Sequence, residues 1–158
     1  MPRERHPATR IGAALNNLGE CAELLGDLPA AQRYHRASLA HCLGIGDQPG
    51  VAFARANLGG LLRLEGRMDE AEAELRAGLE IASALGFDYA RGLLTHNLAA
   101  CAWARRDALT ARRLAEDAQR IFERCQATDR AEAPARLLAE IDAAAALAAS
   151  GGKSGSGG

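Results

Sequence analysis

Aromatic residues and surplus positive charge are both scarce in this chain. Phe, Trp and Tyr make up 4% of the 158 residues, and the formal net charge is −1. Proteins that bind nucleic acid neutralise its phosphate groups with Lys and Arg and stack its bases on aromatic side chains. We therefore do not expect nucleic acid to be a partner of this chain.

Long apolar segments are also absent from the sequence. No stretch approaches the roughly 18 consecutive apolar residues that are needed to span a bilayer. Residues 1–10 are polar and contain prolines, unlike the apolar core of a secretory signal. We expect a soluble, cytoplasmic protein with no membrane partner.

The four cysteines lack the spacing of a metal site or of a compact disulfide framework. They are Cys21, Cys42, Cys101 and Cys125, and no C-x-x-C pair occurs among them. Cys21 and Cys101 hold the same position of the repeat described below, where the middle unit has Leu61. Free cysteines are commonly buried, so we expect both to be small buried apolar side chains. We expect neither a metal ion nor another cofactor.

Motifs of known catalytic chemistry are missing as well. The histidines, His6, His35, His41 and His96, belong to different predicted elements, and neither a His-Glu-x-x-His motif nor a serine nucleophile elbow occurs. The Gly-Lys-Ser near the C-terminus is not a phosphate-binding loop, because Leu147 stands where that loop needs a glycine. The chain is predicted not to be an enzyme.

What the sequence does contain is a repeat of forty residues. The dipeptide Asn-Leu recurs at Asn17, Asn57 and Asn97 inside an apolar helical pattern. A period of this size is typical of stacked two-helix units. The 48% of hydrophobic residues are mostly Ala and Leu, which favour helices over strands. The sequence therefore predicts an all-α protein. The same register aligns Gly19 with Gly59, Gly26 with Gly66, Gly46 with Gly86, and Ala31 with Ala71 and Ala111.

The predicted solenoid covers residues 8–149 as one domain. Its three units span about 8–46, 47–86 and 87–126, and a capping helix follows at about 129–149. The cap covers the apolar end of the stack, which would otherwise be exposed. Residues 1–7 are predicted to be an N-terminal extension, and residues 150–158 a flexible Gly/Ser tail.

Local signals predict details of the units. Asp47 is a candidate N-cap for the first helix of the second unit. The third unit has Arg106 where the earlier ones have a turn glycine, so we expect this corner to be less regular. The first helix of unit one is predicted to bury an apolar stripe of Leu15, Leu18, Ala22 and Leu25.

These residues resemble the tetratricopeptide repeat family. The resemblance rests on the Leu-Gly pairs at Leu18 and Leu58, the turn glycines and the alanines of the second helices, and it covers roughly residues 10–125. It implies a right-handed α-solenoid of three helix hairpins plus a C-terminal capping helix. The usual period is 34 residues. The longer period, together with segments 14–20 and 26–34, resembles the sensor arms of bacterial transcriptional regulators.

In that family the first helix of each unit lines the concave face, where we look for binding residues. Asn17, Asn57 and Asn97 recur along one line, and an amide can both donate and accept hydrogen bonds. They either grip an extended peptide or bond a neighbouring helix. Trp103 is either an anchor in the groove or packs under the terminal helix. The predicted groove residues are Asn16, Asn17, Glu20, Glu23, Phe53, Asn57, Arg63, His96, Asn97 and Trp103.

Two functional hypotheses follow from the predicted solenoid. The first is a non-catalytic protein-interaction module that binds a peptide or a partner segment in its concave groove. Only Arg63 is a cation on the predicted face, which disfavours a ligand selected by its C-terminal carboxylate. The alternative is a regulatory sensor segment of a bacterial transcriptional regulator that binds a small effector or a neighbouring domain. Self-association through an apolar edge of the stack, giving a homo-oligomer, is a third interpretation.

Overall fold

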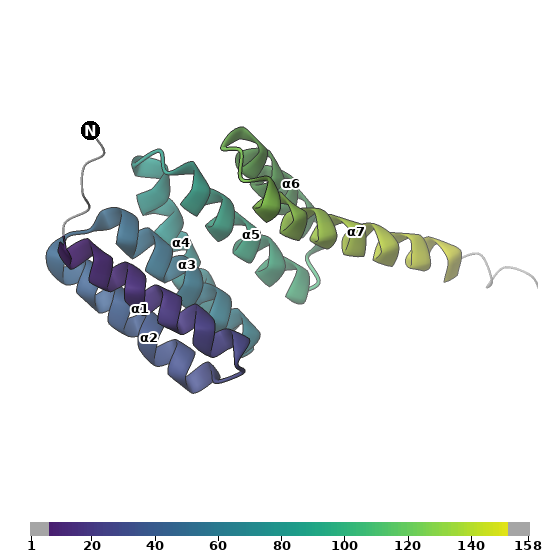
Figure 1. Ribbon diagram of the computed structural model, residues 1–158. Helices are drawn as coiled ribbons and strands as arrows, with labels where there is room; N and C mark the ends of the chain where they lie inside the picture. The colour runs from purple at the N-terminus through teal and green to yellow at the C-terminus, as the bar shows by residue number, and fades with distance from the viewer. Residues whose placement is uncertain (1–6, 152–158) are drawn as a thin grey trace, which may run out of the picture.

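The chain is a row of seven α-helices in the part that the computed structural model describes, residues 7–151. Figure 1 shows them following one another from α1 at one end to α7 at the other. The predicted all-α solenoid is confirmed. None of these helices is long and apolar enough to cross a membrane. The helices are α1 (Pro7–Leu24), α2 (Leu28–Ile45), α3 (Gln48–Leu64), α4 (Met68–Ala84), α5 (Asp88–Ala104), α6 (Ala108–Arg124) and α7 (Thr128–Gly151).

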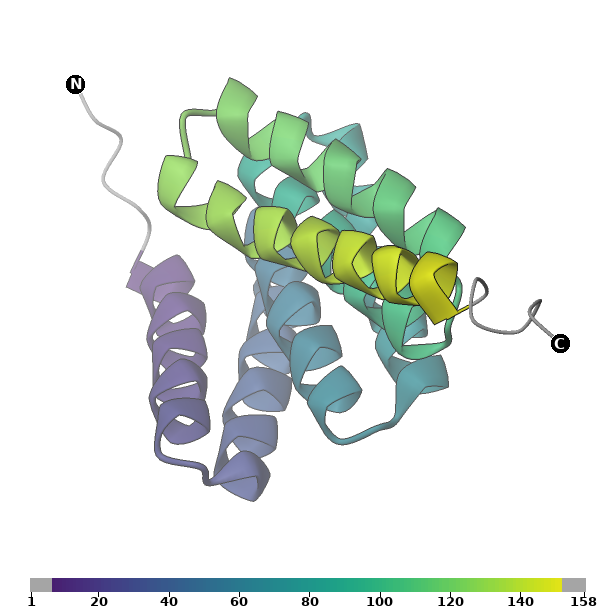
Figure 2. The same ribbon diagram turned by 90° about the vertical axis from the view of Figure 1, so that its right-hand side faces the viewer.

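Both ends of the helical region differ slightly from the prediction. α1 begins at Pro7, inside the predicted extension of 1–7, and α7 continues to Gly151, inside the predicted tail of 150–158. The rest of these two terminal segments lies outside the described residues. In Figure 1 the second half of α7 extends beyond the stack, and Figure 2, viewed from that side, shows α7 in front of the other helices.

Aspartate side chains cap the N-termini of three helices. The side chain of Asp47 accepts a hydrogen bond from the Gly50 N–H at 3.1 Å, which confirms it as the N-cap of α3. Asp27 caps α2 in the same way through the Ala30 N–H at 2.9 Å. Asp107 does so for α6. These caps pair N–H groups that the helix itself leaves without an acceptor.

The first helices of the units lie on the inner side of a curved stack. α1 contacts α3, α3 contacts α5, and α5 contacts α7. Among the described residues no comparable contact joins α2 to α4 or α4 to α6. In a curved stack, neighbouring repeats approach each other more closely on the inner side. The concave face is therefore lined by α1, α3, α5 and α7.

Within each hairpin a small residue of the first helix faces a second-helix residue of complementary size. A Cβ added at Gly59 would lie 2.6 Å from Leu75 Cδ2, and one added at Gly19 would lie 2.4 Å from His35 Cε1. Unit three has a buried alanine at both equivalent positions. A larger residue on one helix is thus matched by a smaller one on the other. Each hairpin therefore stays closely packed although the residues differ between units.

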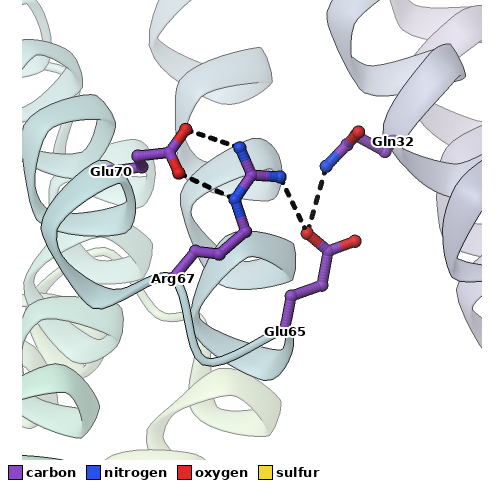
Figure 3. Close-up of polar contacts among 4 residues, drawn as sticks. All are labelled: Gln32, Glu65, Arg67 and Glu70. Atoms are coloured by element: carbon purple, nitrogen blue, oxygen red, sulfur yellow. Dashed lines mark hydrogen bonds and ion pairs between the residues drawn. The ribbon is translucent and has the colours of Figure 1, made fainter.

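A polar contact ties each hairpin to the next. In Figure 3, Glu65 at the end of α3 accepts hydrogen bonds from Gln32 of α2 and from Arg67, both at 3.1 Å. Forty residues further on, Glu72 and Arg105 hold the positions of Gln32 and Glu65. They form an ion pair at 2.8 Å. The contact between units therefore recurs at the same place with different chemical groups.

The apolar stripe predicted for the first helix is wrong. Of its four residues only Ala22 is buried, while Leu18 is 47% and Leu25 85% exposed. Leu58 and Leu98 hold the position of Leu18 in the later units. Both are almost fully buried, because α2 packs beside α3 and α4 packs beside α5. Among the described residues no helix precedes α1. The residues that α1 does bury are Gly12, Asn16, Gly19 and Ala22.

The same cause overturns one prediction about the cysteines. Cys101 is buried, as expected, but Cys21 is exposed. Both hold the same position of the repeat, and Leu61 between them is fully buried. The position is apolar in every unit, and it is covered only where another helix lies before it.

The corner of the third unit is regular, contrary to the expectation from its missing glycine. Arg106 has φ 65°, in the left-handed region that Gly66 occupies with φ 77°. Its N–H donates to the carbonyl of Trp103 at 3.0 Å, and the Gly66 N–H donates to that of Arg63 at the same distance. A side chain in this conformation is strained. The turn is therefore kept by the packing of the hairpin despite a poorly suited residue.

We expect Arg106→Gly to raise the free energy of unfolding by about 1 kcal/mol, because glycine adopts this conformation without steric strain. Urea denaturation followed by circular dichroism measures the change. The matched reverse substitution, Gly66→Ala, is expected to lower the free energy of unfolding by a similar amount. A decrease for Arg106→Gly would contradict this account of the corner.

Candidate binding groove

Two adjoining pockets hollow the concave face. The first has a volume of about 460 Å³ and lies between α1 and α3; the second, about 540 Å³, extends from α1 across α3 and α5 to α7. Glu20 and Asn57 line both pockets, so we call them together the concave groove. Of the predicted site residues, the first pocket is lined by Asn16, Asn17, Glu20, Phe53 and Asn57, and the second by Glu20, Glu23, Asn57, Arg63, His96 and Asn97.

Trp103 is the predicted site residue that does not join this groove. It lines a separate pocket with Leu109 and Ile141, and it packs on the buried cluster that α7 completes. This is the alternative that the sequence left open, with Trp103 packed under the terminal helix. It arises because α7 lies against the end of α5 and covers a side chain that would otherwise face solvent.

Aromatic rings form one side of the first pocket. Phe53 and Phe87 line it, with their ring centroids 5.1 Å apart in an edge-to-face arrangement. Tyr89 continues the row, 5.7 Å from Phe53 and 6.1 Å from Phe122. Edge-to-face packing of this kind stabilises ring positions beyond simple burial. The first pocket therefore combines a firm apolar wall with the amides of Asn17 and Asn57.

Sequence reasoning missed Phe87 as a lining residue. It precedes α5 at the repeat position of Asp47, the residue that caps α3. Its side chain makes no capping hydrogen bond. An aromatic residue in place of a capping aspartate is the signal that marks Phe87 as a residue placed for packing.

The recurring asparagines lie along the groove at equivalent places. The Asn57 amide donates to Glu20 Oε1 at 3.3 Å, which joins neighbouring first helices. The Asn97 amide lies beside Gly60, where an added Cβ would be 3.4 Å from Asn97 Oδ1. Gly60 is the repeat equivalent of Glu20, so both amides face the same position of the preceding unit. Asn17 is exposed and lines the first pocket.

Two of the predicted residues also hold a buried histidine. The His35 ring is fully buried, with Nε2 2.7 Å from Glu23 Oε1 and Nδ1 3.4 Å from Asn16 Oδ1. Since Nε2 faces a carboxylate oxygen, it is the nitrogen that donates to Glu23. Asn16 and Glu23 therefore fix the first hairpin from inside, while the recurring asparagines line the open part of the groove.

His96 lines the second pocket, and its ring is neutral at pH 7. Burial, together with the positive charges of Arg63 and Arg136, lowers its pKa from 6.5 to about 4. Its Nδ1 is buried and has no hydrogen-bond partner among the described residues, and the same holds for Nε of Arg63. Buried polar atoms are normally paired, so these two atoms are exceptions to that rule, and both are shielded from solvent by the surrounding side chains.

The second pocket carries opposite charges on its two sides. Glu20 and Glu23 line it from α1, and Arg63 lines it from α3. Arg130 of α7 adds a second cation. The expectation that Arg63 is the single cation of this face is therefore wrong, because the folding of α7 beside α5 brings in a residue from a distant part of the sequence.

Comparisons with known proteins agree with this fold. Residues 10–84 match the sequence model of the family described as tetratricopeptide repeat. A search of curated proteins gives no match. Among solved structures, a Rap protein complexed with competence and sporulation factor has a TM-score of 0.52 and 22% sequence identity. The similarity covers 89% of this chain but only 43% of that one. Together these findings support a tetratricopeptide-repeat relationship and a solenoid fold.

The environment of His96 is open to direct measurement. We expect an NMR titration of its ring protons to give a pKa of about 4. Arg63→Gln should raise this pKa by about half a unit or more, because a positive charge beside the ring is removed. The control Arg76→Gln, at an exposed position of α4, should leave it unchanged. A pKa near 6.5 in the wild-type protein would contradict the burial described here.

The same shift makes folding depend on pH. The pKa of His96 is lower in the folded chain than its ordinary value of 6.5, so the unfolded chain binds the proton first as pH falls. The free energy of unfolding should therefore be fully retained above pH 6.5 and decrease between pH 6.5 and 4. Urea denaturation at several pH values measures this, and His96→Gln is expected to make the decrease shallower.

Proposed function

We propose that this chain is a non-catalytic protein-interaction module that binds a peptide or a partner segment in the concave groove. The observation that carries the proposal is the repetition of one amide per unit along a hollow formed by the first helices. A peptide backbone offers one donor and one acceptor per residue. Amide side chains can serve both, so a row of them suits an extended segment of any sequence.

The two pockets support this proposal by offering different subsites. The aromatic wall of Phe53 and Phe87 suits an apolar side chain, since burying apolar surface there is favourable. The second pocket suits a charged segment, because Glu20 lines it from α1, Arg63 from α3 and Arg130 from α7. A segment with an apolar anchor followed by charged residues fits this order of subsites.

The solved structure of similar fold supports binding by this class of solenoid. It is a Rap protein complexed with competence and sporulation factor, and this chain spans less than half of its length. At 22% identity the similarity concerns the fold. The binding surface of the present chain therefore rests on its own residues.

A second candidate function is that of a sensor segment whose groove takes a small effector. The first pocket favours it, because about 460 Å³ lies within the range of small-molecule sites and its lining is largely apolar. Such a ligand would occupy the pocket beside Phe53 and Phe87 without reaching Asn97. The two candidates therefore predict different effects of substituting Asn97.

The double substitution Asn57→Ala with Asn97→Ala tests the proposal. Linear peptides selected for binding to the wild-type chain from a random phage library serve as probes, and calorimetry gives their affinities. We expect the double variant to bind them at least about tenfold more weakly, since each lost hydrogen bond contributes roughly 1 kcal/mol.

The control is Gln119→Ala, which removes an amide from α6 at a position that lines neither pocket of the groove. Its affinity should equal that of the wild type. Circular dichroism confirms that each variant is folded. Selected peptides that bind the double variant with unchanged affinity would overturn the proposal, and so would a selection that yields no groove-binding peptide. Loss of affinity on Asn57→Ala alone, for a small molecule, would favour the sensor function.

A further inference from the structure

The amides along the concave groove meet a carboxylate at one place and not at the next. The position that faces Asn57 is held by Glu20, whose Oε1 accepts the amide hydrogen bond at 3.3 Å. One unit further on, the position that faces Asn97 is held by Gly60, which has no side chain. Among the described residues the Asn97 amide forms no hydrogen bond, although it lines the groove as Asn57 does.

The space beside Asn97 belongs to the second pocket, which Gly60 and Asn97 both line. A Cβ added at Gly60 would lie 3.4 Å from Asn97 Oδ1 and 3.5 Å from Asn97 Nδ2, which are ordinary contact distances. A ligand group that enters this space therefore meets the amide of Asn97. It lies where Glu20 meets Asn57 in the preceding pair of helices.

Arg63 stands one helical turn from Gly60 on the same side of α3, and it is partly buried. Four other arginines of the described residues are also partly buried, and each forms an ion pair with a carboxylate of this chain. They are Arg55, Arg67, Arg91 and Arg112. Arg63 forms no ion pair with any described residue. Because its Nε is shielded from solvent, a ligand reaches the terminal nitrogens of the guanidinium.

The carboxylates that line the second pocket have partners elsewhere. Glu20 accepts the amide hydrogen bond described above, and Glu23 Oε1 lies 2.7 Å from Nε2 of the buried His35. Both carboxylates come from α1. The lining residues from α3, α5 and α7 include Arg63 and Arg130 but no Asp or Glu. This side of the pocket therefore carries positive charge that no carboxylate of its own lining offsets.

An anionic oxygen is the group that satisfies both side chains. A carboxylate accepts hydrogen bonds from an amide and from a guanidinium, and bonds to such charged partners are stronger than neutral ones. A backbone carbonyl would accept from Asn97 but would leave the charge of Arg63 without a counter-charge. A cationic ligand group would be repelled by Arg63 and Arg130. Charge complementarity therefore selects an acidic group at this place.

We propose that Gly60, Arg63 and Asn97 form a subsite for an aspartate or glutamate side chain of the bound segment. The carboxylate accepts hydrogen bonds from the Asn97 amide and the Arg63 guanidinium, at the place that Glu20 fills for Asn57. The repeat of the chain itself thus contains the model for the contact. This inference rests on the proposed binding of a segment in the concave groove, and it adds which side chain that segment carries.

Replacement of acidic residues in groove-binding peptides tests the recognised group. The probes are the phage-selected peptides whose affinity falls in the Asn57→Ala, Asn97→Ala double variant. They are synthesised with an amidated C-terminus, so that side chains supply their only carboxylates. Each Asp is replaced by Asn and each Glu by Gln, and calorimetry gives the affinities for the wild-type chain. We expect one such replacement to weaken binding at least about tenfold, because a charge-assisted hydrogen bond becomes a neutral one.

Arg63→Gln identifies the partner of that carboxylate. In this variant the affinities of the acidic peptide and its amide version should differ by less than about threefold, because the positive charge that distinguishes the two peptides is gone. The control Arg76→Gln, at an exposed position that lines neither pocket, should keep the full difference between them.

Gly60→Glu supplies the carboxylate from the chain itself. The new side chain should accept from Asn97, as Glu20 does from Asn57, and pair with Arg63 one turn away. The acidic peptide should then bind at least about tenfold more weakly. The matched control, Gly60→Ala, adds a Cβ without a charge and should bind within about threefold of the wild type. Circular dichroism confirms that both variants are folded.

Two results would overturn this inference and leave the proposed function in place. The first is that groove-binding peptides keep their affinity when every acidic residue is replaced by its amide. The second is that Gly60→Glu and Gly60→Ala bind the acidic peptide equally well. A selection that yields no groove-binding peptide would instead overturn the proposed function, and this inference with it.

Discussion

The structure depends on the packing of each second helix against the first helix of the next unit. This contact sets the order of the stack, and the repeated apolar positions on α3 and α5 exist for it: Leu58 and Leu98 are almost fully buried there. It leaves each first helix with one side toward its own hairpin, one toward the preceding unit and one toward the concave groove. On α1, which no helix of the described residues precedes, the same residue pattern is exposed.

The sequence predicted what short-range chemistry determines. Helix bounds follow from capping aspartates such as Asp47 and from glycines at the turns, and the forty-residue period carries these signals through the chain. The groove face could be predicted because its residues share one side of a helix whose period is known.

The predictions that were wrong concern residues whose surroundings depend on contacts between distant parts of the sequence. Leu18 and Cys21 look like core residues, and they are exposed because no helix of the described residues covers them. Arg130 and Trp103 take their places because α7 lies against α5.

The corner at Arg106 shows how far tertiary packing overrides local preference. Its left-handed conformation is the one that glycine supplies in the other units. The N–H of Arg106 donates to the carbonyl three residues earlier, as the N–H of Gly66 does in the second unit. The hairpin contacts, repeated along α5 and α6, must outweigh the strain of one residue. In this hairpin both equivalent positions hold alanine, Ala99 and Ala115, and such small residues let α5 and α6 pack closely.

α1 has three faces with different surroundings. Gly12, Asn16 and Gly19 face α2, and their small size or hydrogen bonding admits Cys42 and His35. Asn17 and Glu20 face the groove. Leu18 and Cys21 lie on a third face, which no helix of the described residues covers. The first two faces share residues, because Gly12 and Asn16 also line the first pocket. The packing of α1 on α2 therefore helps to set the shape of the groove.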